Sequence, residues 1–140
     1  PNGMVNSNSM VSFNHYAYGA IGDWLYRWAA GLQEAAPGFR EIRIKPYLND
    51  HFTSMKAEQR TPYGLASSGW TKEGDALTLT VEIPANTTAE VYVPSAAADK
   101  VTESGRALDG RSDLKVAGWD DGYTLVRLGS GRYEFRSTLK

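Results

Sequence analysis

Residues 77–94, LTLTVEIPANTTAEVYVP, contain two apolar–polar alternations separated by a polar turn. The first alternation places four aliphatic residues two positions apart: Leu77, Leu79, Val81 and Ile83. Because successive side chains of a strand point to opposite faces, this spacing predicts a strand with one buried and one wet face. The second alternation, Ala89, Val91 and Val93, predicts another strand. Asn86-Thr87-Thr88 matches an N-glycosylation acceptor, but it is most simply the turn between these strands.

The same period of two continues on both sides of this stretch. FREIRIKP (39–46) predicts one strand, and SMKAEQRTPYGLASSGWTKEGDALTLTVEIP (54–84) predicts three. DLKVAGW (113–119), YTLVRLG (123–129) and YEFRST (133–138) follow, with turns at Asp120-Asp121-Gly122 and at 129–131. Seven or eight short strands at this spacing predict a mainly β fold, an antiparallel β-sandwich of Greek-key or jelly-roll type.

The N-terminal part has a different period. In SFNHYAYGAIGDWLYRWAAGL (12–32), apolar residues recur every three or four positions, which predicts a helix over Tyr16–Leu32. Gly31 weakens its end and Pro37-Gly38 closes it, while Asp23 and Arg27 are spaced to form an ion pair. A helix with apolar residues on most of its surface is normally buried on more than one side.

Composition limits the classes of function. The 140 residues suit one domain with a short appendage, and the absence of cysteine excludes disulfides, thiolate metal sites and a cysteine nucleophile. With a net charge of -1 and no basic run, we expect no nucleic-acid partner. No apolar stretch reaches the length of a membrane span, and nothing identifies the compartment. The start at Pro1 rather than Met indicates an excised piece, so a lost signal peptide stays open.

Two histidines are the first candidates for chemistry. His15 lies at the helix entrance among Phe13, Tyr16 and Tyr18, where it could bind sugar hydroxyls while the rings stack on a sugar. The alternative, which spacing alone favours, is a packed histidine that caps the helix. His51 is expected in a solvated loop, and no metal-ligand spacing appears.

The remaining candidates favour structural roles. Glu58, Glu82 and Glu90 fall at outward strand positions and do not suggest the carboxylate pair that glycoside cleavage needs. Asp120-Asp121-Gly122 reads as a hairpin turn rather than a calcium loop. Trp70 and Trp119 could form a sugar-stacking platform, but the sandwich core is the commoner place for tryptophan.

These stretches together resemble a known family. SFNHYAYGAIGDWLYRWAAGL, PGFREIRIKP, AEQRTPYGLASSGW and LTLTVEIPANTTAEVYVP are similar to the C-terminal end of bacterial α-L-rhamnosidases of glycoside hydrolase family 78. The closing ESGRAL and DDGYTLVRLGSGRYEF also fit, so the resemblance covers essentially the whole chain. NHYAYG followed by DWLYR is its most specific part.

The resemblance implies a domain organisation and a site. Residues 1–36 would be a loop and the last helix of the catalytic (α/α)6 barrel, and residues 37–140 a C-terminal β-sandwich. His15 would contact rhamnose in the intact enzyme, with Asn14 and Tyr16 as weaker candidates. The acid and base glutamates of this inverting family would lie upstream of Pro1.

The expected function follows from that organisation. We expect a non-catalytic, stabilising domain of an enzyme that acts on rhamnose-containing glycosides, with no hydrolysis by this piece alone and with no metal or cofactor. Its partner would be the enzyme's own barrel, and the severed helix would fold back on the sandwich or mediate self-association. A stand-alone carbohydrate-binding module and a purely structural assembly sandwich are the alternatives.

Overall fold

The computed structural model describes residues 17–140. It opens with helix α1 and a π-helical turn, and short 3-10 turns lie at Pro37–Phe39 and Ala98–Lys100. The helical segments are α1, Ala17–Trp24, and the π-helical turn, Leu25–Ala29. The described strands are β1 Leu32–Glu34, β2 Glu41–Ile44, β3 Ser54–Thr61, β4 Gly64–Glu73, β5 Ala76–Ile83, β6 Thr88–Pro94, β7 Val101–Glu103, β8 Arg106–Ala107, β9 Leu114–Asp120, β10 Tyr123–Leu128 and β11 Gly131–Thr138.

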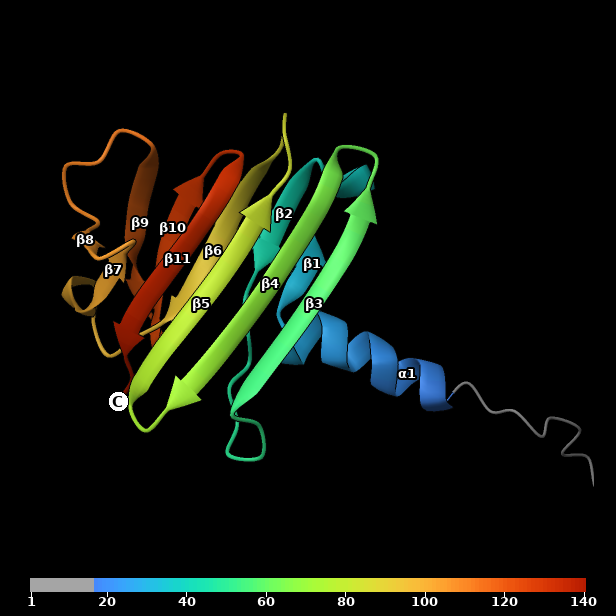
Figure 1. Cartoon of the computed structure of the whole chain (residues 1–140), viewed down its shortest axis with the longest axis horizontal. Helices are drawn as coiled ribbons and strands as arrows, with labels where there is room; N and C mark the ends of the chain where they lie inside the picture. Colours follow the sequence, from blue (N-terminus) through green and yellow to red (C-terminus); the bar gives the residue numbers. More distant parts are fainter. Residues whose placement is uncertain (1–16) are drawn as a thin grey trace, which may run out of the picture.

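The strands form two facing sheets (Figure 1). Sheet A has the order β1-β2-β6-β10-β9, and sheet B has the order β3-β4-β5-β11-β7-β8. All of the neighbouring strands pair antiparallel except β2 and β6, which pair parallel. A parallel pair needs a long crossover, and here β3, β4 and β5 supply it by passing through the other sheet. The predicted mainly β sandwich is confirmed, with this one parallel pair added.

The core lies between the two sheets. The alternating residues of the opening stretch point inward as predicted, from Leu77 to Val93. Trp70 and Phe135, which are 2% and 0% exposed, are the largest of the fully buried side chains. The turns predicted at Asn86 and Asp121 are confirmed, because both residues have a positive φ in a turn. Asn86 lies in the connection from β5 in sheet B to β6 in sheet A, and Asp121 lies in the hairpin of β9 and β10.

The helix ends earlier than predicted. Helical geometry stops at Ala29, and Leu32 opens strand β1 opposite Ile44, so the predicted helix end at Leu32 is wrong. The cause is Gly31, whose φ of 75° is the left-handed conformation that ends helices. A Cβ here would lie 2.2 Å from the backbone nitrogen of Pro46. Gly31 therefore starts the sandwich, rather than merely weakening the helix.

Two outcomes were expected for the severed helix: folding back on the sandwich is wrong, because its large apolar side chains are exposed, and self-association stays a prediction. Ile21, Trp24 and Trp28 are 56%, 41% and 54% exposed, and α1 projects away from the sheets (Figure 1). No helix within residues 17–140 has the length and apolar character needed to cross a membrane.

Candidate functional site

The resemblance implied a sugar contact at the entrance of the helix. His15, Asn14 and Tyr16 lie outside the described residues, so their role stays a prediction. The assignment of residues 1–36 to a catalytic domain also stays a prediction.

The other polar candidates lie where the sequence predicted. His51 is exposed in a loop, where the Asn49 side chain accepts hydrogen bonds from the backbone N–H of His51 and Phe52. Each of the three predicted outward glutamates forms an ion pair: Glu58 with Lys56, Glu82 with Arg132 and Glu90 with Arg127. These carboxylates are neutralised on the strand surfaces, as expected for solvated faces. Within residues 17–140 no group of acidic or histidine side chains is arranged to hold a metal ion.

The two candidate platform tryptophans have different environments. Trp70 lies in the core as predicted, whereas Trp119 is 40% exposed, so a core position for Trp119 is wrong. A β-bulge after Val116 places Trp119 opposite the buried Thr124, on the inner side of sheet A. Trp119 is nevertheless exposed, because β9 is the edge strand of that sheet. Its indole N–H donates to the carbonyl of Ser95 at 3.1 Å, and the Lys140 ammonium lies 5.1 Å from its ring centroid. The two tryptophans therefore do not form one platform.

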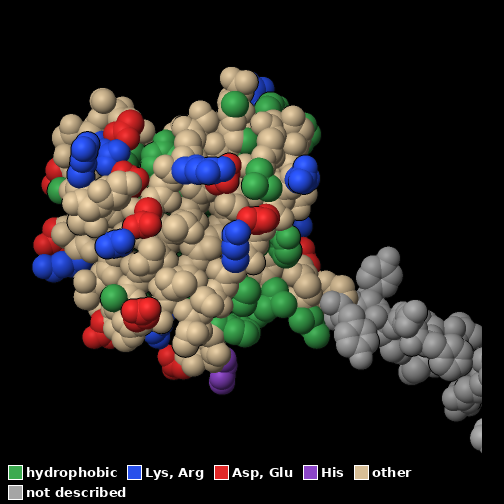
Figure 2. All heavy atoms as spheres, viewed as in Figure 1, with side chains coloured by type: hydrophobic (Ala, Val, Ile, Leu, Met, Phe, Trp, Pro, Cys, Tyr) green, Lys and Arg blue, Asp and Glu red, His purple; other side chains and the backbone are tan. Residues whose placement is uncertain are grey.

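The most apolar exposed surface is the helix face, defined here as Ile21, Trp24 and Trp28. In Figure 2, hydrophobic side chains gather where α1 leaves the sandwich, whereas positive and negative side chains are interspersed over the sheet face in view. Tryptophan is the residue that most often anchors protein interfaces. The helix face is thus a candidate contact surface for another protein part.

The end of the helical segment is fixed to the sandwich by buried hydrogen bonds. The Trp70 indole N–H donates to the carbonyl of Ala29 at 2.7 Å, and the Ser68 hydroxyl donates to the carbonyl of Ala30 at 2.7 Å. These two carbonyls are among the last of the helical segment, which have no partner within a helix. The sandwich therefore caps the helix from its own core.

Further contacts fix the direction of the helical segment. The Tyr26 hydroxyl donates to the carbonyl of Glu58 on β3 at 2.7 Å, and the backbone N–H of Tyr47 donates to the carbonyl of Trp28 at 2.8 Å. The predicted pair of Asp23 and Arg27 is confirmed, with Nε and Oδ1 2.6 Å apart. Both partners are well exposed, so this pair adds at most about 0.5 kcal/mol.

A buried carboxylate escaped the sequence analysis. Glu103 is only 3% exposed, and its carboxylate accepts hydrogen bonds from Ser104, the backbone N–H of Glu134 and, at 2.5 Å, Arg111. Arg111 also binds Asp113. Burial raises the pKa of Glu103, but these hydrogen bonds outweigh it and hold the pKa below its usual range.

This cluster is structural. It ties the segment after β8 to β7 and leaves the Glu103 carboxylate fully committed to its own neighbours. The alternation of Val101 with Glu103 was the available signal that Glu103 points inward. The pattern was too short to predict a strand here, because β7 is only three residues long.

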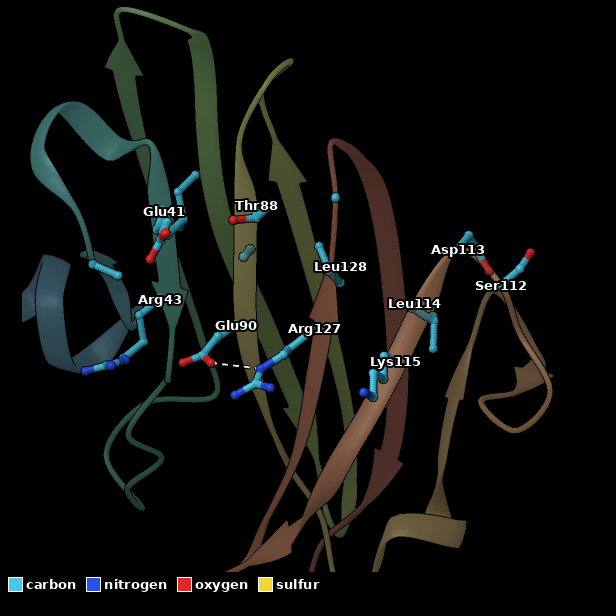
Figure 3. Close-up of a pocket in the computed structure, with 14 residues that line it drawn as sticks. Glu41, Arg43, Thr88, Glu90, Ser112, Asp113, Leu114, Lys115, Arg127 and Leu128 are labelled. Atoms are coloured by element: carbon cyan, nitrogen blue, oxygen red, sulfur yellow. Dashed lines mark hydrogen bonds and ion pairs between the residues drawn. The ribbon is translucent and has the colours of Figure 1, made fainter.

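A groove with charged side chains of both signs lies on the outer face of sheet A (Figure 3). It has a volume of about 610 Å³, and its floor is formed by β2, β6, β10 and the start of β9. Arg43, Glu90, Arg127 and Lys115 lie along it, and a dashed line marks the pair of Glu90 with Arg127 (Figure 3). The groove is thus lined by charged side chains, whereas the helix face consists of apolar ones.

Fold and site together define the class: a β-sandwich domain with an attached helical arm that offers an apolar face. Glu103 is the one buried carboxylate among the residues whose burial is described, and it is bonded to Arg111. Residues 31–108, more than half of the chain, match the family described as the bacterial alpha-L-rhamnosidase C-terminal domain. The chain belongs to this family.

Two alpha-L-rhamnosidases are similar to this chain over nearly its whole length. The chain is 33% identical over 135 residues to an alpha-L-rhamnosidase of Streptomyces avermitilis, covering 96% of this chain and 12% of the relative. It is also 33% identical over 132 residues to an alpha-L-rhamnosidase of Formosa agariphila, covering 94% of this chain and 14% of the relative. The chain thus spans only about an eighth of the length of these relatives.

Solved structures show the same architecture. The crystal structure of the Streptomyces avermitilis alpha-L-rhamnosidase complexed with L-rhamnose superposes with a TM-score of 0.80 at 32% identity, covering 99% of this chain and 13% of that one. An alpha-L-rhamnosidase from Dictyoglumus thermophilum gives a TM-score of 0.77 at 28% identity, covering 91% and 14%.

Proposed function

We propose that this chain is a non-catalytic domain of an α-L-rhamnosidase, which it stabilises by docking the helix face onto the enzyme's catalytic domain. The observation that carries the proposal is the exposure of Ile21, Trp24 and Trp28 on one helical segment. The sandwich encloses a core of its own, so it does not need these side chains for folding. An apolar centre with aromatic anchors is what a stable protein interface requires.

Two further features support a fixed position for the helix. The core donors Trp70 and Ser68 hold the last helical carbonyls, so the helix face is presented in one direction. Relatives named as rhamnosidases are many times longer than this chain, so most of each relative is available to cover such a face. Preorganisation of this kind reduces the entropy lost on docking.

The reaction itself belongs to the rest of the enzyme in this proposal. Inverting glycoside hydrolysis needs two carboxyl groups across a substrate cleft, one of them with a raised pKa. Glu103 has the opposite pKa shift and is occupied by Arg111. Rhamnose-containing glycosides would therefore bind the whole enzyme, to which His15, and less strongly Asn14 and Tyr16, would contribute sugar contacts.

The test compares this chain with a longer product of its gene that includes the upstream region. We expect the longer protein to hydrolyse an aryl α-L-rhamnoside and residues 1–140 to give no turnover. A Trp24→Ser/Trp28→Ser variant should lower the melting temperature of the longer protein by several degrees, as expected for a loss of about 2 kcal/mol or more. The control is Tyr63→Ser, an equally aromatic residue that is 39% exposed at a hairpin turn.

Each result decides between functions. Turnover by residues 1–140 alone, or no rhamnoside hydrolysis by the longer protein, would contradict the proposal. An equal decrease in melting temperature for Tyr63→Ser would show that the helix face has no specific docking role. The face serves self-association instead if residues 1–140 dimerise through it and the double substitution leaves the melting temperature of the longer protein unchanged. A rise in KM for rhamnoside in a His15→Ala variant of the longer protein would support the sugar contact.

A further inference from the structure

The two sheets have four edge strands, and β9 is a long edge that stays open. The edges are β1 and β9 in sheet A, and β3 and β8 in sheet B. β1 and β8 are only three and two residues long. On the eight-residue edge β3, the carbonyl of Glu58 already accepts a hydrogen bond from the Tyr26 hydroxyl. β9 has seven residues, of which five are exposed, and within residues 17–140 no turn or loop bonds to its backbone. An open edge of this length can pair with another strand.

The middle of β9 is small and uncharged. In the register with β10, Val116 and Gly118 have partners, and Ala117 between them is the extra residue of the β-bulge. Gly118 has a φ of 149°, which favours glycine, and a Cβ there would meet nothing within 4 Å. The backbone of a second strand can therefore approach closely here. A bulge discourages edge pairing in general, so any partner must fit the residues on both sides of it.

The residues that flank the bulge are divided between the two faces of sheet A. Val116 and Trp119 are opposite buried residues of β10, so both lie on the inner side of the sheet. Lys115 and Asp120 are opposite Arg127 and Tyr123 of β10, so both lie on the outer side. Both are exposed, and neither forms an ion pair with another residue of the part that the structure describes. In each direction from the bulge, an apolar residue is thus followed by a charged one, and the two charges are opposite.

We propose that two copies of this chain pair antiparallel through β9, about a two-fold axis at residues 117–118. In this register Lys115 of each copy is opposite Asp120 of the other, and Val116 is opposite Trp119. The bulge makes the faces agree, because outer residues meet outer residues and inner residues meet inner ones. Ion pairs and pairs of a β-branched with an aromatic residue stabilise neighbouring strands, and each pair occurs twice about the axis. β9 is therefore complementary to itself in charge and in shape.

The pairing leaves the helix face free. β9 lies at the opposite edge of sheet A from β1, and α1 projects from the other side of the sandwich (Figure 1). Two five-stranded sheets would join into one sheet of ten strands. Because only one short strand from each copy forms the contact, we expect a weak dimer with a Kd on the order of 100 µM. The inference goes beyond the proposed function and does not depend on it.

The test is sedimentation equilibrium of residues 1–140 at low salt, over protein concentrations of about 10–500 µM. All proteins carry Trp24→Ser/Trp28→Ser, so that the helix face cannot mediate association. We expect this parent protein to dimerise. Adding either Lys115→Glu or Asp120→Lys places like charges opposite each other at both pairs, and should weaken dimerisation by about tenfold or more.

An equal mixture of these two charge variants tests the register. In a mixed dimer opposite charges face each other again at both pairs, so the mixture should dimerise to within about threefold of the parent. Lys115→Glu/Asp120→Lys in one chain should do the same. The matched control is Lys56→Glu on β3, which makes the same change of charge and should alter the Kd by less than about twofold. Circular dichroism of each variant checks that the sandwich is folded.

Three outcomes would overturn the proposal. The first is a parent protein that stays monomeric, or a dimer that neither single charge variant weakens. The second is equal weakening by Lys56→Glu, which would indicate a response to overall charge. The third is a mixture that dimerises no better than its two components, which would show that Lys115 and Asp120 do not face each other. These measurements need no turnover and no upstream region, so a failure here is separate from a failure of the proposed function.

Discussion

The sandwich interior and the helical segment place tryptophan in opposite environments. Trp70 is 2% exposed between the sheets, and its indole N–H is bonded to Ala29, whereas Trp28 is 54% exposed one position before that same alanine. Burial of a large aromatic side chain contributes several kcal/mol to folding, and exposure contributes little. The sandwich thus has its stabilising contacts within the chain, while the helix face leaves its apolar surface exposed. The two regions should respond differently to the same substitution.

The largest contrast is expected between Trp70→Ala and Trp28→Ala. Removing Trp70 leaves a cavity between the sheets and a buried Ala29 carbonyl without its donor, which should lower the free energy of unfolding by about 3–5 kcal/mol. Trp28→Ala should stay within about 0.5 kcal/mol in the same chain. Urea denaturation of residues 1–140 measures both values. Similar losses for the two variants would show that the helix face is packed in solution.

The next largest effect is expected where the two regions join. In Gly31→Ala the new methyl group meets the Pro46 backbone at 2.2 Å, and alanine disfavours the φ of 75°. We expect a loss of about 2–3 kcal/mol. Gly22→Ala, in a helical position with open space around it, is the matched control and should be neutral or slightly stabilising. Equal stability of the two variants would mean that the junction can rearrange.

The Glu103 cluster should give the sandwich a pH dependence. Because the folded-state pKa of Glu103 is lowered, its contribution is present above the unfolded pKa and is lost as pH falls through the folded value. The protein should lose stability as pH falls from about 5 to 3. Glu103→Gln should cost about 2 kcal/mol at pH 7 and flatten that part of the profile. Melting curves across this range test it, and an unchanged slope in the variant would contradict the assignment.

The smallest effect is expected for Tyr26→Phe. It removes only the hydrogen bond from the Tyr26 hydroxyl to Glu58 on β3, in a half-exposed position. A loss of about 0.5–1 kcal/mol is expected. Amide exchange should accelerate in α1 and stay unchanged in β5, which lies in the core. Faster exchange in both would indicate that the helix is part of the sandwich's folding unit.

The regular strands were predictable because alternation is a local property. From β2 to β6 each strand has its inward residues two positions apart, and the turns carry their own glycine, asparagine or proline. Strands β1, β7 and β8 were not predicted, because two or three residues are too few to show a period.

The site residues divide in the same way. Alternation predicts the outward direction of Glu58, Glu82 and Glu90. Their ion-pair partners, by contrast, depend on the overall fold. Arg43 and Lys115 share a groove only because β2 pairs with β6 and β9 pairs with β10, which no local pattern records. The position of Trp119 depends on a bulge in β9 that alternation does not show.

The carbonyls of Ala29 and Ala30 limit how such domains can be exchanged during evolution. A recombination event that joined the sandwich to an unrelated helix would leave two buried donors, Trp70 and Ser68, without acceptors. Only a new helix that ended with carbonyls at the same two places would satisfy them. The last turn of the helix and the sandwich are therefore expected to be inherited together. A sandwich joined to a helix in this way is expected to be inherited with that helix, unlike a module on a flexible linker.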